Sequence, residues 1–133
     1  MLTAAASGTD VSCNGGSDGS ATVTASGGTP GYTYLWSDGQ TTATASGLSA
    51  GLYSVTVTDI NLCTTTVTVT ISEPSLISVT ALALTNVSCN GLSDGSATVT
   101  VGGGTPGYTY LWSNGETTQT AISLAAGTHS CTV

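Results

Sequence analysis

The feature that most constrains this chain is an internal repeat. Residues 27–39 read GGTPGYTYLWSDG, and residues 103–115 read GGTPGYTYLWSNG. At the same offset of 76 residues, residues 9–57 and 85–133 are identical at most positions. A long repeat of this kind indicates tandem copies of one small domain. We therefore predict two domains in the chain rather than one.

The boundary between the two copies is predicted at residues 72–75, Ser-Glu-Pro-Ser, because turn-forming residues of this kind interrupt strands. The predicted domains are residues 1–73 and 74–133. The constant offset also pairs residues 1–9 with residues 77–85, so each domain is expected to open with an extended segment.

Alternating apolar and hydroxyl residues predict β-strands in both domains. Ala21, Val23 and Ala25 alternate with Thr and Ser, which places the apolar side chains on one face of a strand. Short strands separated by frequent turns are typical of an immunoglobulin-like sandwich. We predict an all-β fold of two tandem immunoglobulin-like antiparallel β-sandwiches. The second lacks its final strand, because the chain reaches Val133 before any counterpart of residues 63–71.

The repeated aromatic strand is the predicted anchor of each core. It contains both tryptophans of the chain, Trp36 and Trp112, together with Tyr34 and Tyr110. A buried aromatic side chain removes about 150 to 250 Å² from water, and this chain has no Phe to do the same. The alternative is that these rings are exposed and bind carbohydrate. Exposure of the indoles would favour carbohydrate binding, and burial would favour a structural role.

Composition excludes several classes of function. The net charge is −7 with no Lys or Arg, so the chain cannot neutralise the phosphates of nucleic acid or of an anionic membrane surface. No apolar run approaches the roughly 18 residues of a membrane span. With one His and no paired acids in an apolar setting, the sequence offers no catalytic constellation and no cofactor site. We predict a protein that is not an enzyme.

Three phrases in a fixed order resemble a known repeat family. They are Cys-Asn-Gly-x-Ser-Asp-Gly-Ser-Ala-Thr-Val, the Gly-Gly-Thr-Pro-Gly-Tyr-Thr-Tyr-Leu-Trp-Ser phrase, and Leu-x-Ala-Gly before a Tyr-Ser-Val-Thr-Val-Thr-Asp strand. Together they resemble the SprB repeat of long Bacteroidetes surface proteins, including gliding-motility adhesins, which is similar in plan to PKD-type domains. The resemblance implies a bacterial extracellular or cell-surface location and a structural or adhesive role, with surface glycans among the partners to consider.

In an extracellular setting, the cysteines are candidates for disulfides. We predict that Cys13 pairs with Cys63 across the first domain, the alternative being two buried free thiols. Cys89 and Cys131 are a further candidate pair in the second domain. The Ser-Asp-Gly loops at Asp18 and Asp94 could offer ligands to calcium, but one acid in each loop favours simple turn formation.

The missing last strand leads to a prediction about assembly. An open sheet edge on so small a domain needs a partner. The first candidate is the opening arm of a neighbouring copy, with the residues Met1, Leu2, Thr3, Ala4, Ala5 and Ala6. Head-to-tail strand addition gives an open filament, that is, a homopolymer. The alternative is that later residues of a longer repeat protein supply the strand.

Overall fold

The computed structural model describes the backbone of residues 1–133 and all side chains except those of residues 80 and 81. It divides into two compact units, Met1–Pro74 (unit 1) and Ser75–Val133 (unit 2), so the division falls next to the predicted boundary. Both units consist of strands and connecting turns, and the described residues contain no helix. The predicted all-β tandem sandwich fold is confirmed.

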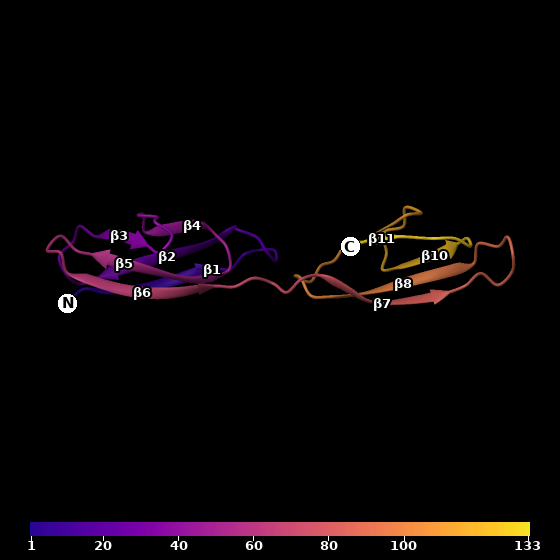
Figure 1. Cartoon of the computed structure of the whole chain (residues 1–133), viewed down its shortest axis with the longest axis horizontal. Coiled ribbons are helices and arrows are strands. Elements are labelled where there is room, and N and C mark those ends of the chain that lie inside the picture. The colour runs from indigo at the N-terminus through magenta and orange to yellow at the C-terminus, as the bar shows by residue number, and fades with distance from the viewer. The chain divides into compact units, whose positions relative to one another are not determined.

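Unit 1, in which every residue is described, is a sandwich of two antiparallel sheets (Figure 1). One sheet has the order β1-β2-β4 and the other β3-β5-β6. β1 opens the unit and β6 closes it, and both run from the end that holds Met1 toward the opposite end. The strands are β1 (Thr3–Thr9), β2 (Gly19–Ser26), β3 (Thr33–Trp36), β4 (Thr44–Leu48), β5 (Gly51–Thr58) and β6 (Thr64–Ile71).

The core of unit 1 lies between these sheets and follows the alternation of the sequence. In β2, Ala21 and Val23 are buried, whereas Thr24, on the opposite face of the strand, is exposed. In β5, Val55 and Val57 are fully buried. β-branched residues suit such a two-sided strand surface. The buried set is Leu2, Val11, Ala21, Val23, Trp36, Ala45, Leu48, Val55, Val57 and Ile71.

Trp36 is the largest buried side chain of unit 1, with 2% of its surface exposed. It lies at the end of β3, opposite Val55 of β5. Its indole Nε1–H donates to the carbonyl of Thr42 at 2.9 Å, so the one polar atom of the ring is satisfied by the turn that follows the strand. Burial and this hydrogen bond together fix the loop between β3 and β4 on the core.

Asp59 connects the β5–β6 turn to the Gly-Gly-Thr-Pro-Gly turn. One carboxylate oxygen accepts from the backbone N–H of Thr29 at 3.0 Å, and the other from the N–H groups of Asn61 and Cys63, each at 2.9 Å. These N–H groups, that of Thr29 first and then that of Cys63, lower the pKa of Asp59 below its usual value. In a chain without Lys or Arg, backbone donors take the place of a salt bridge.

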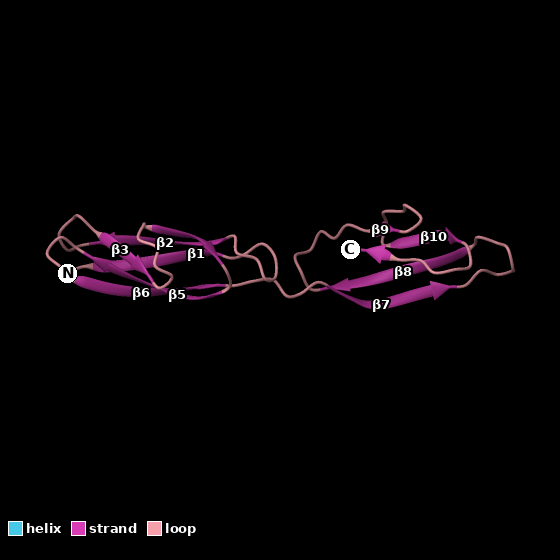
Figure 2. Cartoon of the chain, turned by 45° about the horizontal axis from the view of Figure 1, so that its top comes forward, coloured by secondary structure: helices cyan, strands magenta, loops and turns pink.

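The described residues of unit 2 repeat the plan of unit 1, with fewer strands (Figure 2). One sheet has the order β10-β8-β7, and a two-stranded pair, β11-β9, faces it. The core consists of Ala97, Val99, Trp112, Ala121 and Leu124. The strands are β7 (Ser78–Thr85), β8 (Gly95–Gly102), β9 (Leu111–Trp112), β10 (Thr120–Leu124) and β11 (Cys131–Thr132).

The opening strand of unit 2 contains one more residue than that of unit 1 over the same length of its partner strand. β1 pairs with β2 without a shift, whereas the register of β7 against β8 shifts between Val79 and Ala81. The shift is a β-bulge, which adds one residue to one strand. For residues that precede the bulge, the offset between equivalent positions is 75 instead of 76. Leu76, and not Ile77, lies beside the first glycine of the Gly-Gly-Thr-Pro-Gly turn, as Met1 does in unit 1.

The separate cores lead to a prediction for Trp36→Ala and Trp112→Ala. Each substitution should destabilise its own unit by about 3 to 5 kcal/mol, because it leaves a cavity in a small core. The remaining indole then reports on the other unit, whose denaturation midpoint, followed by fluorescence, should not change. Circular dichroism would follow the loss in the mutated unit. Equal shifts in both units would contradict the division into separate cores.

A second prediction concerns acid stability and Asp59→Asn. Since the folded-state pKa of Asp59 is lowered, its contribution to stability is complete above the unfolded-state value and is lost as pH falls through the folded-state value. The variant should lower the denaturation midpoint of unit 1 near neutral pH, and the difference from the unchanged chain should shrink in acid. Fluorescence measures unit 1 when Asp59→Asn is compared with the unchanged residue in the Trp112→Ala chain, where Trp36 is the remaining indole.

The matched control is Asp38→Asn, because Asn114 already stands at the equivalent turn of unit 2. This control should leave the midpoint of unit 1 nearly unchanged. A loss for Asp59→Asn that is as large in acid as at neutral pH would show that the charge of Asp59 plays no part.

Candidate functional site

The repeated aromatic strand lies against the core and does not form an exposed ring surface. Trp36 and Trp112 are 2% and 3% exposed, and both indoles donate to the turn after the strand, Trp112 to the carbonyl of Thr118 at 2.9 Å. Tyr34 and Tyr110 are half-buried and pack against the same cores. The predicted core anchors therefore lie where a structural role requires them.

The other aromatic hydroxyls bind the turns of their own units. Tyr32 donates to the carbonyl of Gly27 at 2.6 Å, and Tyr108 donates to Gly103 in the same way. Tyr53 donates to the carbonyl of Ser49 at 3.1 Å. Each of these hydroxyls thus closes a turn.

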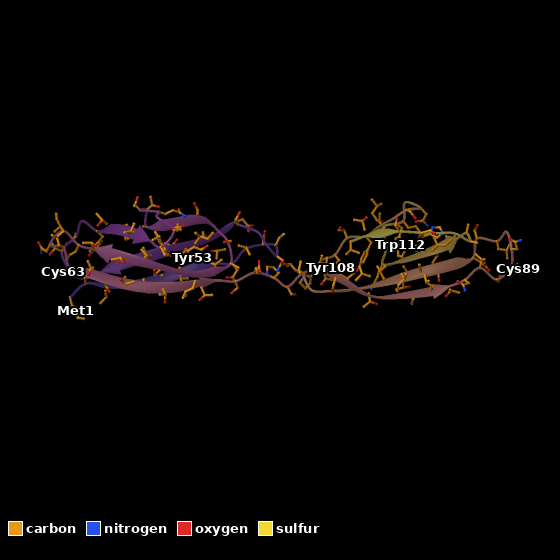
Figure 3. The ribbon with its side chains drawn as sticks, viewed as in Figure 1. Met1, Tyr53, Cys63, Cys89, Tyr108 and Trp112 are labelled. Atoms are coloured by element: carbon orange, nitrogen blue, oxygen red, sulfur yellow. The ribbon has the colours of Figure 1, made fainter. Side chains whose placement is uncertain are left out.

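The structure does not form the predicted disulfide between Cys13 and Cys63. Both residues are exposed free thiols. Cys63 lies beside Met1 at one end of unit 1 (Figure 3), just before β6, whereas Cys13 follows Val11, which bonds to Ser72 just after β6. The eight residues of β6 span about 26 Å, and a disulfide needs Cα atoms within about 7 Å. The pairing is wrong because the two cysteines flank the strand at opposite ends.

The cysteines of unit 2 are also free. Cys89 is exposed in the loop after β7 (Figure 3). Cys131 is half-buried in β11, directly opposite Trp112 of β9. The candidate bond between them is not made in the structure. His129, two residues before Cys131, bonds through Nε2 to the carbonyl of Ala125 at 3.0 Å, as Tyr53 does to Ser49 in unit 1.

The Ser-Asp-Gly loops use their carboxylates internally. Asp18 accepts from the backbone N–H of Ser12 at 3.0 Å and from its hydroxyl at 2.5 Å, and Asp94 binds Ser88 with the same distances. The serine hydroxyl, and next the serine N–H, lower the pKa of each aspartate. Among the described residues, no group of three His, Cys, Asp or Glu could hold a metal ion. Calcium binding has no support beyond the sequence.

The opening arm is part of a sheet in the isolated chain. Residues Thr3–Thr9 form β1, which pairs with β2 along its whole length, and Leu2 is buried in the core. Met1 is exposed. Donation of this arm to another copy therefore requires that β1 leave its own sheet.

Unit 2 contains an apolar groove at the position that β6 fills in unit 1. The groove has a volume of about 540 Å³ and lies between β7 and β11. Its β7 wall is exposed, with 55% of Val79, 54% of Leu82 and 64% of Leu84 accessible to water. In unit 1, Val67, Val69 and Ile71 of β6 cover the corresponding core. The lining is Val79, Leu82, Leu84, Ala97, Val99, Trp112, Leu124, Gly127, Thr128, His129 and Cys131.

The outer edge of the groove offers a template for a further strand. Ser130 turns its backbone toward β9, where its carbonyl accepts from Ser113 at 2.8 Å. Since neighbouring residues of a strand turn their backbone groups to opposite sides, His129 and Cys131 present theirs to the open edge. Their counterparts in unit 1, Tyr53 and Val55, pair there with Val69 and Val67 of β6.

The free thiols predict the outcome of alkylation. In the native chain, all four cysteines should react, the exposed Cys13, Cys63 and Cys89 faster than the half-buried Cys131. Mass spectrometry of peptides after short exposure to iodoacetamide would give the order. Recovery of a peptide that links Cys13 to Cys63 from the folded chain would contradict the strand order of unit 1.

Comparison with protein-family models matches residues 5–41 and 81–117 to the SprB repeat. The matches cover more than half of the chain, and each runs from the opening strand of one unit to the turn after its aromatic strand. Searches of curated proteins and of solved structures found no match. The described residues contain no helix long and apolar enough to cross a membrane. SprB repeats are structural repeats of cell-surface proteins, and the resemblance seen in the sequence is confirmed. The chain belongs to the SprB repeat family.

Proposed function

We propose that this chain is an extracellular structural and adhesive repeat protein of a bacterial surface, and that a strand from outside unit 2 completes that unit. The observation that carries the proposal is the open apolar groove between β7 and β11. Unit 1 supports it, because the same sandwich there has β6 in the equivalent place. Membership of the SprB family supports the surface location and the link to adhesion and gliding motility.

Strand addition to unit 2 would build a filament. The acceptor groove lies in unit 2 and the candidate donor arm, residues 1–9, in unit 1, so the contact between two copies is head-to-tail. A contact of this type that does not close on itself gives an open polymer. The backbone groups of His129 and Cys131 supply the hydrogen bonds, and the groove supplies apolar burial.

The carbohydrate-binding alternative depends on exposed aromatic rings. The indoles of Trp36 and Trp112 are buried and hydrogen-bonded to their own turns, so the aromatic strand lacks the stacking surface that this function needs. No observation on the described side chains favours this alternative over the structural role.

The proposal predicts that assembly depends on the edge of β11. Proline removes a backbone donor but is tolerated at a strand edge that faces solvent. His129→Pro should therefore leave unit 2 folded and weaken assembly by about 1 kcal/mol or more, roughly fivefold in association constant. Sedimentation velocity over a range of concentrations, with negative-stain images, measures assembly.

The matched control is His129→Ala, which removes the same side chain and its bond to Ala125 but keeps the backbone N–H. His129→Pro should assemble more weakly than His129→Ala, because His129→Ala keeps the backbone N–H that His129→Pro lacks. A monodisperse monomer of 12.9 kDa at every concentration, with the backbone amides of β11 protected from exchange, would overturn the proposal.

A further inference from the structure

We propose that the groove of unit 2 selects its strand by side-chain size. It accepts residues 1–9 of a second copy, whose inward side chains from Ala4 to Gly8 are small, and rejects a strand of the β6 type. The inference rests on the proposed function, since it names the partner of the same groove. It follows from a comparison of the closed interface in unit 1 with the open one in unit 2.

In unit 1, small residues on β1 make room for large residues on β6. A Cβ atom added to Gly8 would lie 2.6 Å from Cδ1 of Ile71 and 3.0 Å from Cγ2 of Val69. The first distance is far below a normal carbon–carbon contact of about 3.5 to 4.0 Å. The closing strand of unit 1 therefore occupies the space that any side chain at position 8 would need.

In unit 2, the opening strand carries large residues at the same places. Leu84 pairs with Ala97 as Gly8 pairs with Ala21, so Leu84 holds the position of Gly8. By the same registers, Leu82 pairs with Val99 and holds the position of Ala6, which pairs with Val23. A strand with isoleucine and valine at the positions of Ile71 and Val69 would collide with this wall.

Residues 1–9 carry the opposite size pattern. Ala4, Ala6 and Gly8 recur at every second position of β1, so one face of this strand is formed by small residues only. Laid along β7 in the direction in which β6 runs along β1, the arm brings its small residues against Leu82 and Leu84. In unit 1 the small side chains are on β1 and the large ones on β6, whereas in unit 2 the large ones are on β7 and the small ones on the added arm. The total side-chain volume between the two strands is therefore similar in both units.

Charge also favours this arm as the donor. The chain carries a net charge of −7 and has no Lys or Arg, so two copies repel one another wherever acidic segments approach. Residues 1–9 contain no Asp or Glu. The lining of the groove is likewise free of acidic side chains among its described residues.

Donation exchanges one edge for another. β1 is an edge strand of unit 1, and β2 keeps its pairing with β4 when β1 leaves. The donor loses the β1–β2 ladder and the burial of Leu2 in its own core. The acceptor gains a ladder on β11 and covers the exposed wall of Val79, Leu82 and Leu84. Because donation joins two copies, the fraction of chains that donate β1 rises with the concentration of the protein.

The test measures protection of Cys131, which lines the groove, against alkylation by iodoacetamide. Cys89, in an exposed loop outside the groove lining, is the internal reference in the same full-length chain. Three synthetic peptides serve as probes: residues 1–9, residues 64–72, and residues 64–72 with Val69→Ala and Ile71→Gly. The peptide of residues 1–9 and the doubly substituted 64–72 peptide should each slow the alkylation of Cys131 about tenfold when the peptide concentration is ten times its Kd. The unchanged 64–72 peptide should have little effect.

A groove variant reverses the expected preference. Leu82→Ala with Leu84→Gly gives β7 the residues of β1, and the chain should then be protected by the unchanged 64–72 peptide. Equal protection by all peptides, or protection by the unchanged 64–72 peptide alone, would overturn size selection and leave strand addition standing. Protection by none of them, in the chain or its variant, would overturn strand addition itself.

Discussion

Each unit depends on the burial of one indole between two thin sheets. Most other buried side chains are Ala, Val or Leu, so Trp36 and Trp112 supply the largest apolar surface of their cores. The indole N–H also holds the following turn through Thr42 or Thr118. The aromatic phrase is repeated almost unchanged because the strand, the ring and the turn that accepts its hydrogen bond form one packed element in each unit.

The structural carboxylates of this chain find their partners in backbone N–H groups and serine hydroxyls. Without Lys or Arg, Asp59 accepts from three N–H groups, and Asp18 and Asp94 accept from the serine at the start of their loops. Such bonds stabilise the charged form of an acid. An acidic chain can thus fold without ion pairs between side chains, provided that each structural acid lies beside a turn with free donors.

Much of the fold could be predicted from the sequence, because the repeat and the two-residue alternation report directly on strands and faces. The burial of Trp36 and Trp112 followed from their size. The prediction of a Cys13–Cys63 disulfide was wrong, because spacing along the chain does not reveal at which end of a strand each cysteine lies. The bulge in β7 could not be predicted, because an alignment of the two copies at one constant offset does not reveal an extra residue in one strand. The role of Asp59 was missed as well, although an Asp that ends a strand and opens a turn is a signal of this kind of acceptor.

The strand order of unit 1 also determines how the unit would respond to tension. Its two ends leave the sandwich through β1 and β6, at opposite ends of strands that run in the same direction. β1 is paired with β2, and β6 with β5, along their full lengths. A pull on both ends is therefore directed along the strands, and it strains all rungs of each ladder together rather than opening them one after another. This geometry converts ordinary hydrogen bonds into resistance against mechanical extension.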